Sequence, residues 1–135
     1  MHNLTEKEIK LIQESFQLLS SKSAKVGKDF YQLLFERNPE LKELFKVDMN
    51  EQALAFMRMV KTVVEGLNNP QIIIPAVQQL GKRHSEYGVE YKHYKDFGNC
   101  LIECIEKELQ PNFSIETKKA WQKLYNLLAE VMKIE

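Results

Sequence analysis

His84 is the residue of this chain whose type and position are best suited to chemistry. It shares a predicted helical face with the apolar residues Val77 and Leu80. One nitrogen of an imidazole can ligate a metal ion while the other donates a hydrogen bond that fixes the orientation of the ring. A histidine on an apolar helical face is more commonly a hydrogen-bonded residue of a core or an interface. His84 by itself therefore leaves both interpretations open.

The other residues that could ligate a metal offer less. Cys100 and Cys104 are the two cysteines of the chain. Their spacing of four residues places both on one face of a helix, which is typical of core packing and not of a structural disulfide bridge. We interpret them as small apolar residues. His2 lies next to the N-terminus, and His93 stands beside Tyr94 at the start of a predicted helix, where we expect solvent exposure.

The elements that position these side chains are predicted to be helices. Thr5 and Glu8 have the spacing of a capping box, and apolar residues then recur at intervals of three and four. Further helices are expected over residues 26–34, 54–67, 75–88, 91–109 and 114–134. Asn38 is expected to cap a short turn at residues 39–45 that begins with Pro39. No stretch of strict alternation between apolar and polar residues predicts a strand, so the expected fold class is all-α.

Composition limits the possible functions. The chain has 135 residues, enough for one domain with a sizeable core. Lys and Arg together number 19 and so do Asp and Glu, so no surplus of positive charge favours nucleic acid or an anionic membrane as a partner. The apolar run at residues 72–77 is too short to cross a bilayer, and the N-terminus lacks the order of a secretory signal. We expect a cytoplasmic protein.

With these elements in place, the sequence resembles the globin family over essentially its whole length. Residues 80–89, followed by His93 and Tyr94, are similar to the proximal helix and the next corner of bacterial single-domain globins. Residues 41–45 are similar to the corner whose phenylalanine packs on the haem. Within the family, the likeness is to Hell's Gate globins, Vitreoscilla haemoglobin and the globin half of flavohaemoglobins. The resemblance implies a single globin domain over residues 1–135, with helices packed around one buried haem.

The resemblance also implies how the haem is held. His84 takes the place of the proximal iron ligand, and Phe45 that of the phenylalanine in contact with the haem. Leu80, Val89 and Phe97 are further residues that the resemblance places against the haem. No Cys-x-x-Cys-His run occurs, so the haem is expected to be a non-covalent haem b.

On the opposite face of the haem, the resemblance implies a polar pair for a bound ligand. Tyr31 falls where several bacterial globins have a distal tyrosine, and Gln52 falls at the distal position. Phe56, one turn after Gln52, is expected to face the ligand. A phenol and a carboxamide are neutral hydrogen-bond donors that leave ferrous iron open to ligands. If the alignment slips by one residue, Glu51 or Ala53 takes the distal position instead. Tyr31 and Gln52 could also be ordinary helix residues whose polar ends reach solvent.

Proximal support follows from the same resemblance. Tyr94 follows His84 at the interval seen in flavohaemoglobin-like globins, where a tyrosine and a late glutamate support the ligand histidine. Glu135 is the nearest candidate for that glutamate, but it is displaced by one position from the pattern. Cations near the edge of the haem would offset the negative charge of the haem carboxylates. The candidates for this contact are His93, Arg83 and Lys82.

Three functions remain open at this stage. The first is reversible binding of dioxygen and of other diatomics such as carbon monoxide and nitric oxide. The second is nitric oxide dioxygenation, for which a separate reductase would have to return ferric iron to the ferrous state. The third is a haem-based sensor or ligand-binding module. A monomer or a weak homodimer is expected.

Overall fold

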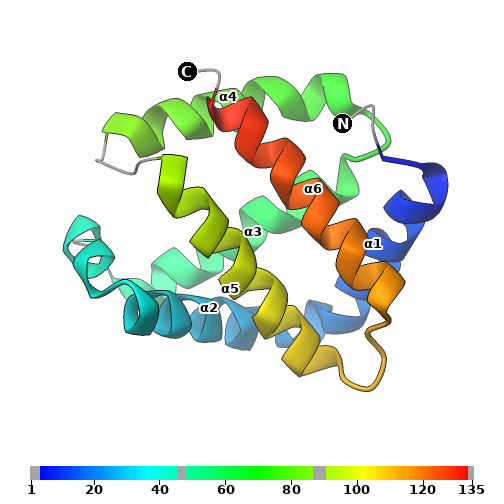
Figure 1. The fold of residues 1–135 in the computed structure, drawn as a ribbon, viewed down its shortest axis with the longest axis horizontal. Coiled ribbons are helices and arrows are strands. Elements are labelled where there is room, and N and C mark those ends of the chain that lie inside the picture. The colour runs from blue at the N-terminus through cyan, green and yellow to red at the C-terminus, as the bar shows by residue number, and fades with distance from the viewer. Residues whose placement is uncertain (1–3, 46–47, 87–90, 134–135) are drawn as a thin grey trace.

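The structure is a computed structural model that describes residues 4–45, 48–86 and 91–133, with only the backbone described for residues 84–86, 91 and 133. Its elements are α1 (Glu6–Leu19), η1 (Ser20–Lys22), α2 (Ser23–Arg37), η2 (Pro39–Leu44), α3 (Met49–Glu65), α4 (Pro70–Glu86), α5 (Tyr91–Leu109) and α6 (Ile115–Lys133), where η denotes a 3-10 helix (Figure 1). Because no strand occurs in these described ranges, the expected all-α class is confirmed.

Short polar side chains start several of these helices. The Thr5 hydroxyl accepts a hydrogen bond from the Glu8 backbone N–H at 3.1 Å, and the Glu8 carboxylate accepts one from the Thr5 N–H at 2.8 Å. The predicted capping box is therefore confirmed. Asp48 accepts from the Asn50 N–H at 2.8 Å before α3, and Ser114 accepts from the Thr117 N–H at 3.0 Å before α6.

Two local predictions were wrong. α4 begins at Pro70 and not near Pro75, which lies inside the helix. Pro75 has no backbone N–H, so the Gln71 carbonyl lacks its usual helical partner. Both residues are exposed, so water can donate a hydrogen bond to that carbonyl. The Asn38 side chain does not cap η2. Its amide instead donates back to the Leu34 carbonyl at 3.5 Å.

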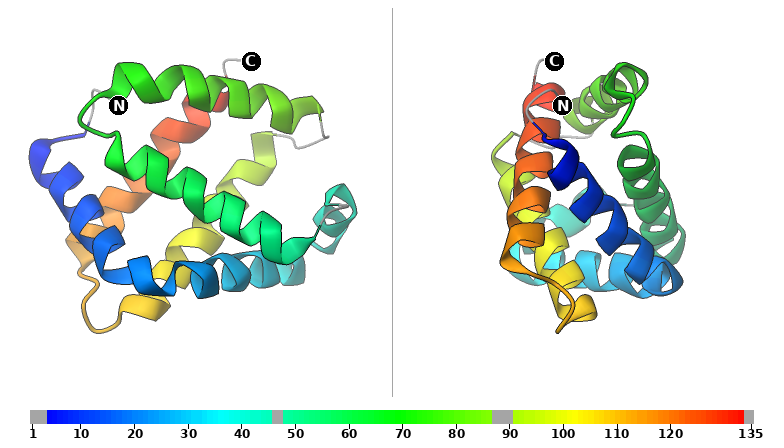
Figure 2. Two further views of the ribbon diagram at one scale, coloured as in Figure 1. Left: turned by 180° about the vertical axis from the view of Figure 1, so that it is seen from behind. Right: turned by 90° about the vertical axis from the view of Figure 1, so that its right-hand side faces the viewer.

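The helices pack around a core to which each of the six α-helices contributes. α2 packs against α3 and α5, while α6 packs against α1, α4 and α5 (Figure 2). α3 and α4 are not among the extensively packed pairs of the described part. Cys100 and Cys104 are free thiols buried in this core, as predicted.

Glycines allow two of the close approaches between helices. A Cβ on Gly27 of α2 would lie 2.8 Å from the Ala53 carbonyl oxygen of α3. A Cβ on Gly81 of α4 would lie 2.7 Å from the Met132 carbonyl oxygen of α6. Within the described ranges, no helix is both long and apolar enough to cross a membrane.

Candidate functional site

An apolar cavity lies between α3, α4, α5 and α6. Its walls are almost entirely aliphatic and aromatic, and they include Phe56 of α3, Leu80 of α4, Phe97 of α5 and Trp121 of α6. The cavity measures about 90 Å³. Three residues expected to surround a cofactor, Phe56, Leu80 and Phe97, are therefore brought together around one cavity.

His84 belongs to the helix that forms one wall of this cavity. Its backbone lies in α4, four residues after Leu80 and seven after Val77, and both of these residues line the cavity. That register places position 84 on the same face of α4. The His84 side chain lies outside the described part of the structure, as does Val89. Their assignment to a haem stays a prediction.

Tyr31 and Gln52 meet in a hydrogen bond between α2 and α3. The Gln52 side-chain amide donates to the Tyr31 hydroxyl at 3.0 Å. Tyr31 is only 7% exposed. Burial raises the pKa of its phenol to about 12, and the hydrogen bond from Gln52 offsets part of that rise. Neither polar group is thus an ordinary surface residue.

The register of α3 favours Gln52 over its two neighbours. Glu51 is exposed. Ala53 is buried and faces α2, where its carbonyl group lies against Gly27. Of the three residues considered from the sequence, Gln52 is the one beside Tyr31.

An aromatic cluster surrounds the Tyr31 ring. The Phe45 ring meets it edge to face at a centroid distance of 5.4 Å and also lies 5.5 Å from Phe35. Phe30 stacks on Phe56 at 4.3 Å with an interplanar angle of 9°. The sequence singled out neither Phe30, which falls within the helix expected over residues 26–34, nor Phe35. The one available signal was the position of Phe35 one turn after Tyr31.

Phe97 of α5 lines the cavity and contacts two residues that do not line it, Tyr94 and His93. Tyr94 is 4% exposed, and its ring meets Phe97 edge to face at 5.9 Å. His93 is 8% exposed, so the expectation of a solvent-exposed histidine was wrong. Its ring stacks on Phe97 at 6.3 Å, because the first turn of α5 packs inward instead of projecting into solvent. Glu135, the candidate partner of Tyr94, lies outside the described residues.

The other expected cations do not approach a described partner. Lys82 and Arg83 are both exposed on α4. Their contact with haem carboxylates therefore stays a prediction, together with that of His93.

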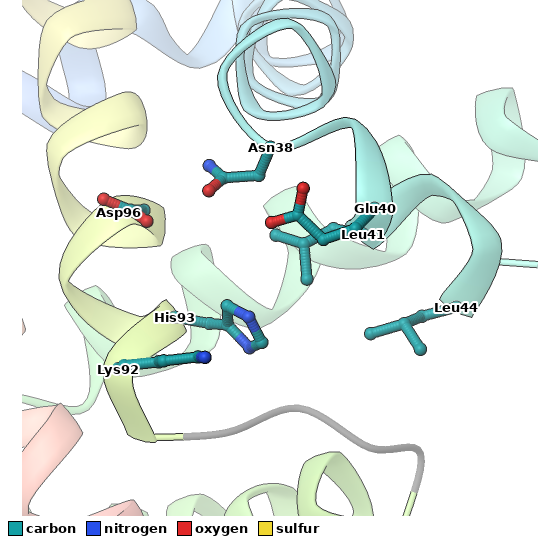
Figure 3. Close-up of a pocket in the computed structure, with 7 residues that line it drawn as sticks. All are labelled: Asn38, Glu40, Leu41, Leu44, Lys92, His93 and Asp96. Atoms are coloured by element: carbon teal, nitrogen blue, oxygen red, sulfur yellow. The ribbon is translucent and has the colours of Figure 1, made fainter.

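A second hollow, of about 410 Å³, lies between η2 and the start of α5. Figure 3 shows the seven side chains that line it: Asn38, Glu40, Leu41, Leu44, Lys92, His93 and Asp96. Its lining includes the carboxylates of Glu40 and Asp96 and the ammonium group of Lys92. Apart from His93, it contains none of the residues expected at a haem.

Two aromatic residues of α6 line the apolar cavity but were not singled out as site residues in the sequence. The Trp121 Nε1–H donates to the Ser15 hydroxyl of α1 at 2.8 Å, which fixes its ring at the cavity wall. The Tyr125 ring lies directly over Gly98 of α5, where any Cβ would collide with it. Burial raises the pKa of the Tyr125 phenol. The spacing of four between Trp121 and Tyr125 was the only sequence signal.

Comparison with known proteins concerns the chain as a whole. The family model Globin matches residues 28–132. A flavohemoprotein of Bacillus cereus is 32% identical over 133 residues, which cover 94% of this chain but only 32% of the relative. A flavohemoprotein of Vibrio cholerae is 29% identical, with 95% of this chain and 33% of the relative covered. The chain thus spans about a third of the length of these curated relatives.

Solved structures show the same fold. An engineered carbene transferase, derived from a candidate nitric oxide dioxygenase of Rhodothermus marinus, has a TM-score of 0.88 and 26% identity, with 98% of this chain and 92% of that chain covered. A bacterial globin of Campylobacter jejuni has a TM-score of 0.79 and 24% identity, with 96% and 97% covered.

Proposed function

Because this chain belongs to the globin family, which implies a haem, we propose that it binds one haem b non-covalently and reversibly binds dioxygen or another diatomic ligand there. His84 would ligate the iron from α4. Phe45, Phe56, Leu80 and Phe97 would contact the macrocycle. The bound haem would supply an iron centre with one position open to a diatomic ligand.

The character of the cavity supports a haem. Its aliphatic and aromatic walls suit a large, flat and mostly apolar group. At about 90 Å³ it is smaller than typical ligand pockets of about 300–1,000 Å³, so its walls must move apart to admit a haem. α3 and α4 are not an extensively packed pair in the described part, so their separation would break few helix contacts.

The observation that carries the ligand proposal is the hydrogen bond between Gln52 and Tyr31. The amide occupies a lone pair of the phenol oxygen, so this bond does not use the phenol proton. No acceptor for that proton is found among the described residues. A buried O–H group without an acceptor gains a hydrogen bond when a polar diatomic ligand binds nearby. Because the phenol is neutral below pH of about 12, it remains a donor at physiological pH.

Haem titration monitored by absorption tests the proposal. We expect one equivalent of haem to give a sharp Soret band, and the reduced protein to give a persistent spectrum with dioxygen and a distinct one with carbon monoxide. The single tryptophan, Trp121, lines the cavity, so its fluorescence should be quenched in the same titration.

Two histidine variants make the titration specific. His84→Ala should abolish stable haem uptake, whereas His2→Ala, at a histidine that the proposal does not place at the haem, should retain it. A normal haem spectrum in His84→Ala would show that His84 is not the iron ligand. Failure of the unsubstituted protein to bind one equivalent would remove the haem itself.

The comparisons favour nitric oxide dioxygenation as a second candidate function. In that reaction nitric oxide, dioxygen and one electron give nitrate, and a separate reductase would supply the electron. Mixing the reduced, dioxygen-equilibrated protein with nitric oxide should yield one nitrate per haem. Nitrate no higher than in a protein-free control would leave reversible ligand binding as the function.

A further inference from the structure

The Tyr31 ring is held by three edge-to-face contacts. Phe30, Phe45 and Phe56 meet it at centroid distances of 4.9, 5.4 and 5.7 Å and interplanar angles of 74°, 71° and 69°. Edge-to-face contacts are directional, because the positive edge of one ring lies against the negative face of another. Rotation of the Tyr31 ring would disturb all three contacts together.

Phe30 contacts two of these residues, Tyr31 and Phe56, and does not itself line the cavity. Phe30 is 2% exposed, and of Phe30, Tyr31 and Phe56 only Phe56 lines the cavity. Its ring is nearly parallel to Phe56 and nearly perpendicular to Tyr31. One buried side chain of α2 thus fixes both the hydrogen-bonding tyrosine and the phenylalanine in the cavity wall.

We propose that Phe30 is a positioning residue that sets the ligand selectivity of this site by holding the Tyr31 hydroxyl and the Phe56 ring at a fixed separation. The inference rests on the proposed function, since the ligand is the diatomic that binds in the cavity. A rigid donor stabilises dioxygen, which accepts hydrogen bonds, more than carbon monoxide, which accepts them weakly. Phe30 therefore favours retention of dioxygen over carbon monoxide without contacting either.

The test replaces Phe30 with leucine in the haem-loaded protein. We expect Phe30→Leu to raise the dioxygen dissociation rate about fivefold, the factor that corresponds to a hydrogen bond of about 1 kcal/mol. The carbon monoxide dissociation rate should change less than about twofold, since that ligand depends little on the donor. If Phe30→Leu does not fold, Phe30→Met provides a flexible replacement of similar bulk with the same expected ratio.

Phe35→Leu is the matched control. Phe35 also touches Tyr31, at 5.9 Å, but its ring is tilted by 38° and no contact joins it to Phe56 within the described part. Its removal should leave the ratio of the two dissociation rates within about twofold of the original.

Two spectroscopic readouts separate positioning from general loosening. The stretching frequency of bound carbon monoxide should move in Phe30→Leu toward its value in Tyr31→Phe, and stay unchanged in Phe35→Leu. The Gln52 side-chain amide protons, protected by their bond to Tyr31, should exchange with solvent several times faster in Phe30→Leu. An unchanged ratio and frequency in Phe30→Leu, or equal effects of Phe35→Leu, would overturn the proposal.

The amide exchange needs no ligand, so failure of this inference is distinguishable from failure of the proposed function. If the unsubstituted protein binds no haem, the proposed function fails, and unchanged Gln52 exchange in Phe30→Leu would separately overturn the positioning role.

Discussion

Gly27→Ala should loosen the helix crossing that brings the polar pair together. Gly27 lies one turn before Tyr31 on α2, against Ala53, the residue after Gln52 on α3. An added Cβ would lie 2.8 Å from the Ala53 carbonyl oxygen and 2.9 Å from Met57 Cγ. The methionine can move aside, but a backbone oxygen cannot. The two helices must therefore separate, and the 3.0 Å hydrogen bond between Gln52 and Tyr31 should lengthen with them.

The expected cost follows from two opposing effects. Overpacking of a tight contact costs about 1–3 kcal/mol. Alanine favours a helix interior over glycine by roughly 1 kcal/mol. We therefore expect Gly27→Ala to lower the free energy of unfolding by up to about 2 kcal/mol, and the melting temperature of a domain of this size by up to roughly 8 °C.

Thermal and urea unfolding measure this effect, and the dioxygen dissociation rate reports the polar pair. Lys28→Ala is the control, because Lys28 is the next residue of α2 and is exposed, so its loss should change stability by no more than about 0.5 kcal/mol. An unchanged or higher melting temperature for Gly27→Ala, with an unchanged dissociation rate, would refute the reasoning.

Three further predictions concern buried polar groups. Tyr31→Phe should speed dioxygen release about tenfold, the factor for a hydrogen bond of about 1.4 kcal/mol, and an unchanged rate in stopped-flow measurements would remove Tyr31 from the ligand site. Because burial raises the Tyr31 pKa from 10.0 to about 12, the unfolded chain loses this proton first. The stability linked to this phenol is therefore complete below pH 10 and falls as pH rises from about 10 to about 12. Urea unfolding should show a smaller loss over that window in Tyr31→Phe, and equal losses would contradict the assignment. Ser15→Ala should leave the Trp121 indole N–H without its acceptor and cost about 1–3 kcal/mol in urea unfolding. Trp121→Phe removes that donor. The variant that combines Ser15→Ala with Trp121→Phe should therefore lose less free energy of unfolding than the sum of the two single variants.

The local features of the fold could be read from the sequence. Capping at Thr5 and Glu8 and apolar spacing are set by residues within a few positions of one another, so they predicted the start of α1. The predicted bounds of the fifth α-helix coincide with α5 (Tyr91–Leu109), and the sixth was predicted to begin one residue before α6 (Ile115–Lys133). Its predicted last residue, Ile134, lies outside the described residues. The face of α4 that carries Leu80 was likewise predictable from its 3.6-residue period.

The site depended on contacts that no local pattern records. Tyr31 and Gln52 are 21 residues apart in sequence, and their hydrogen bond exists because α2 and α3 pack closely at Gly27. The burial of His93 and the stacking of Phe30 on Phe56 likewise depend on how the helices cross. Periodicity tells which face of a helix is apolar, because backbone hydrogen bonds repeat locally. Only the tertiary structure decides which side chain of another helix meets that face, because that depends on the angle and distance at which two helices pack.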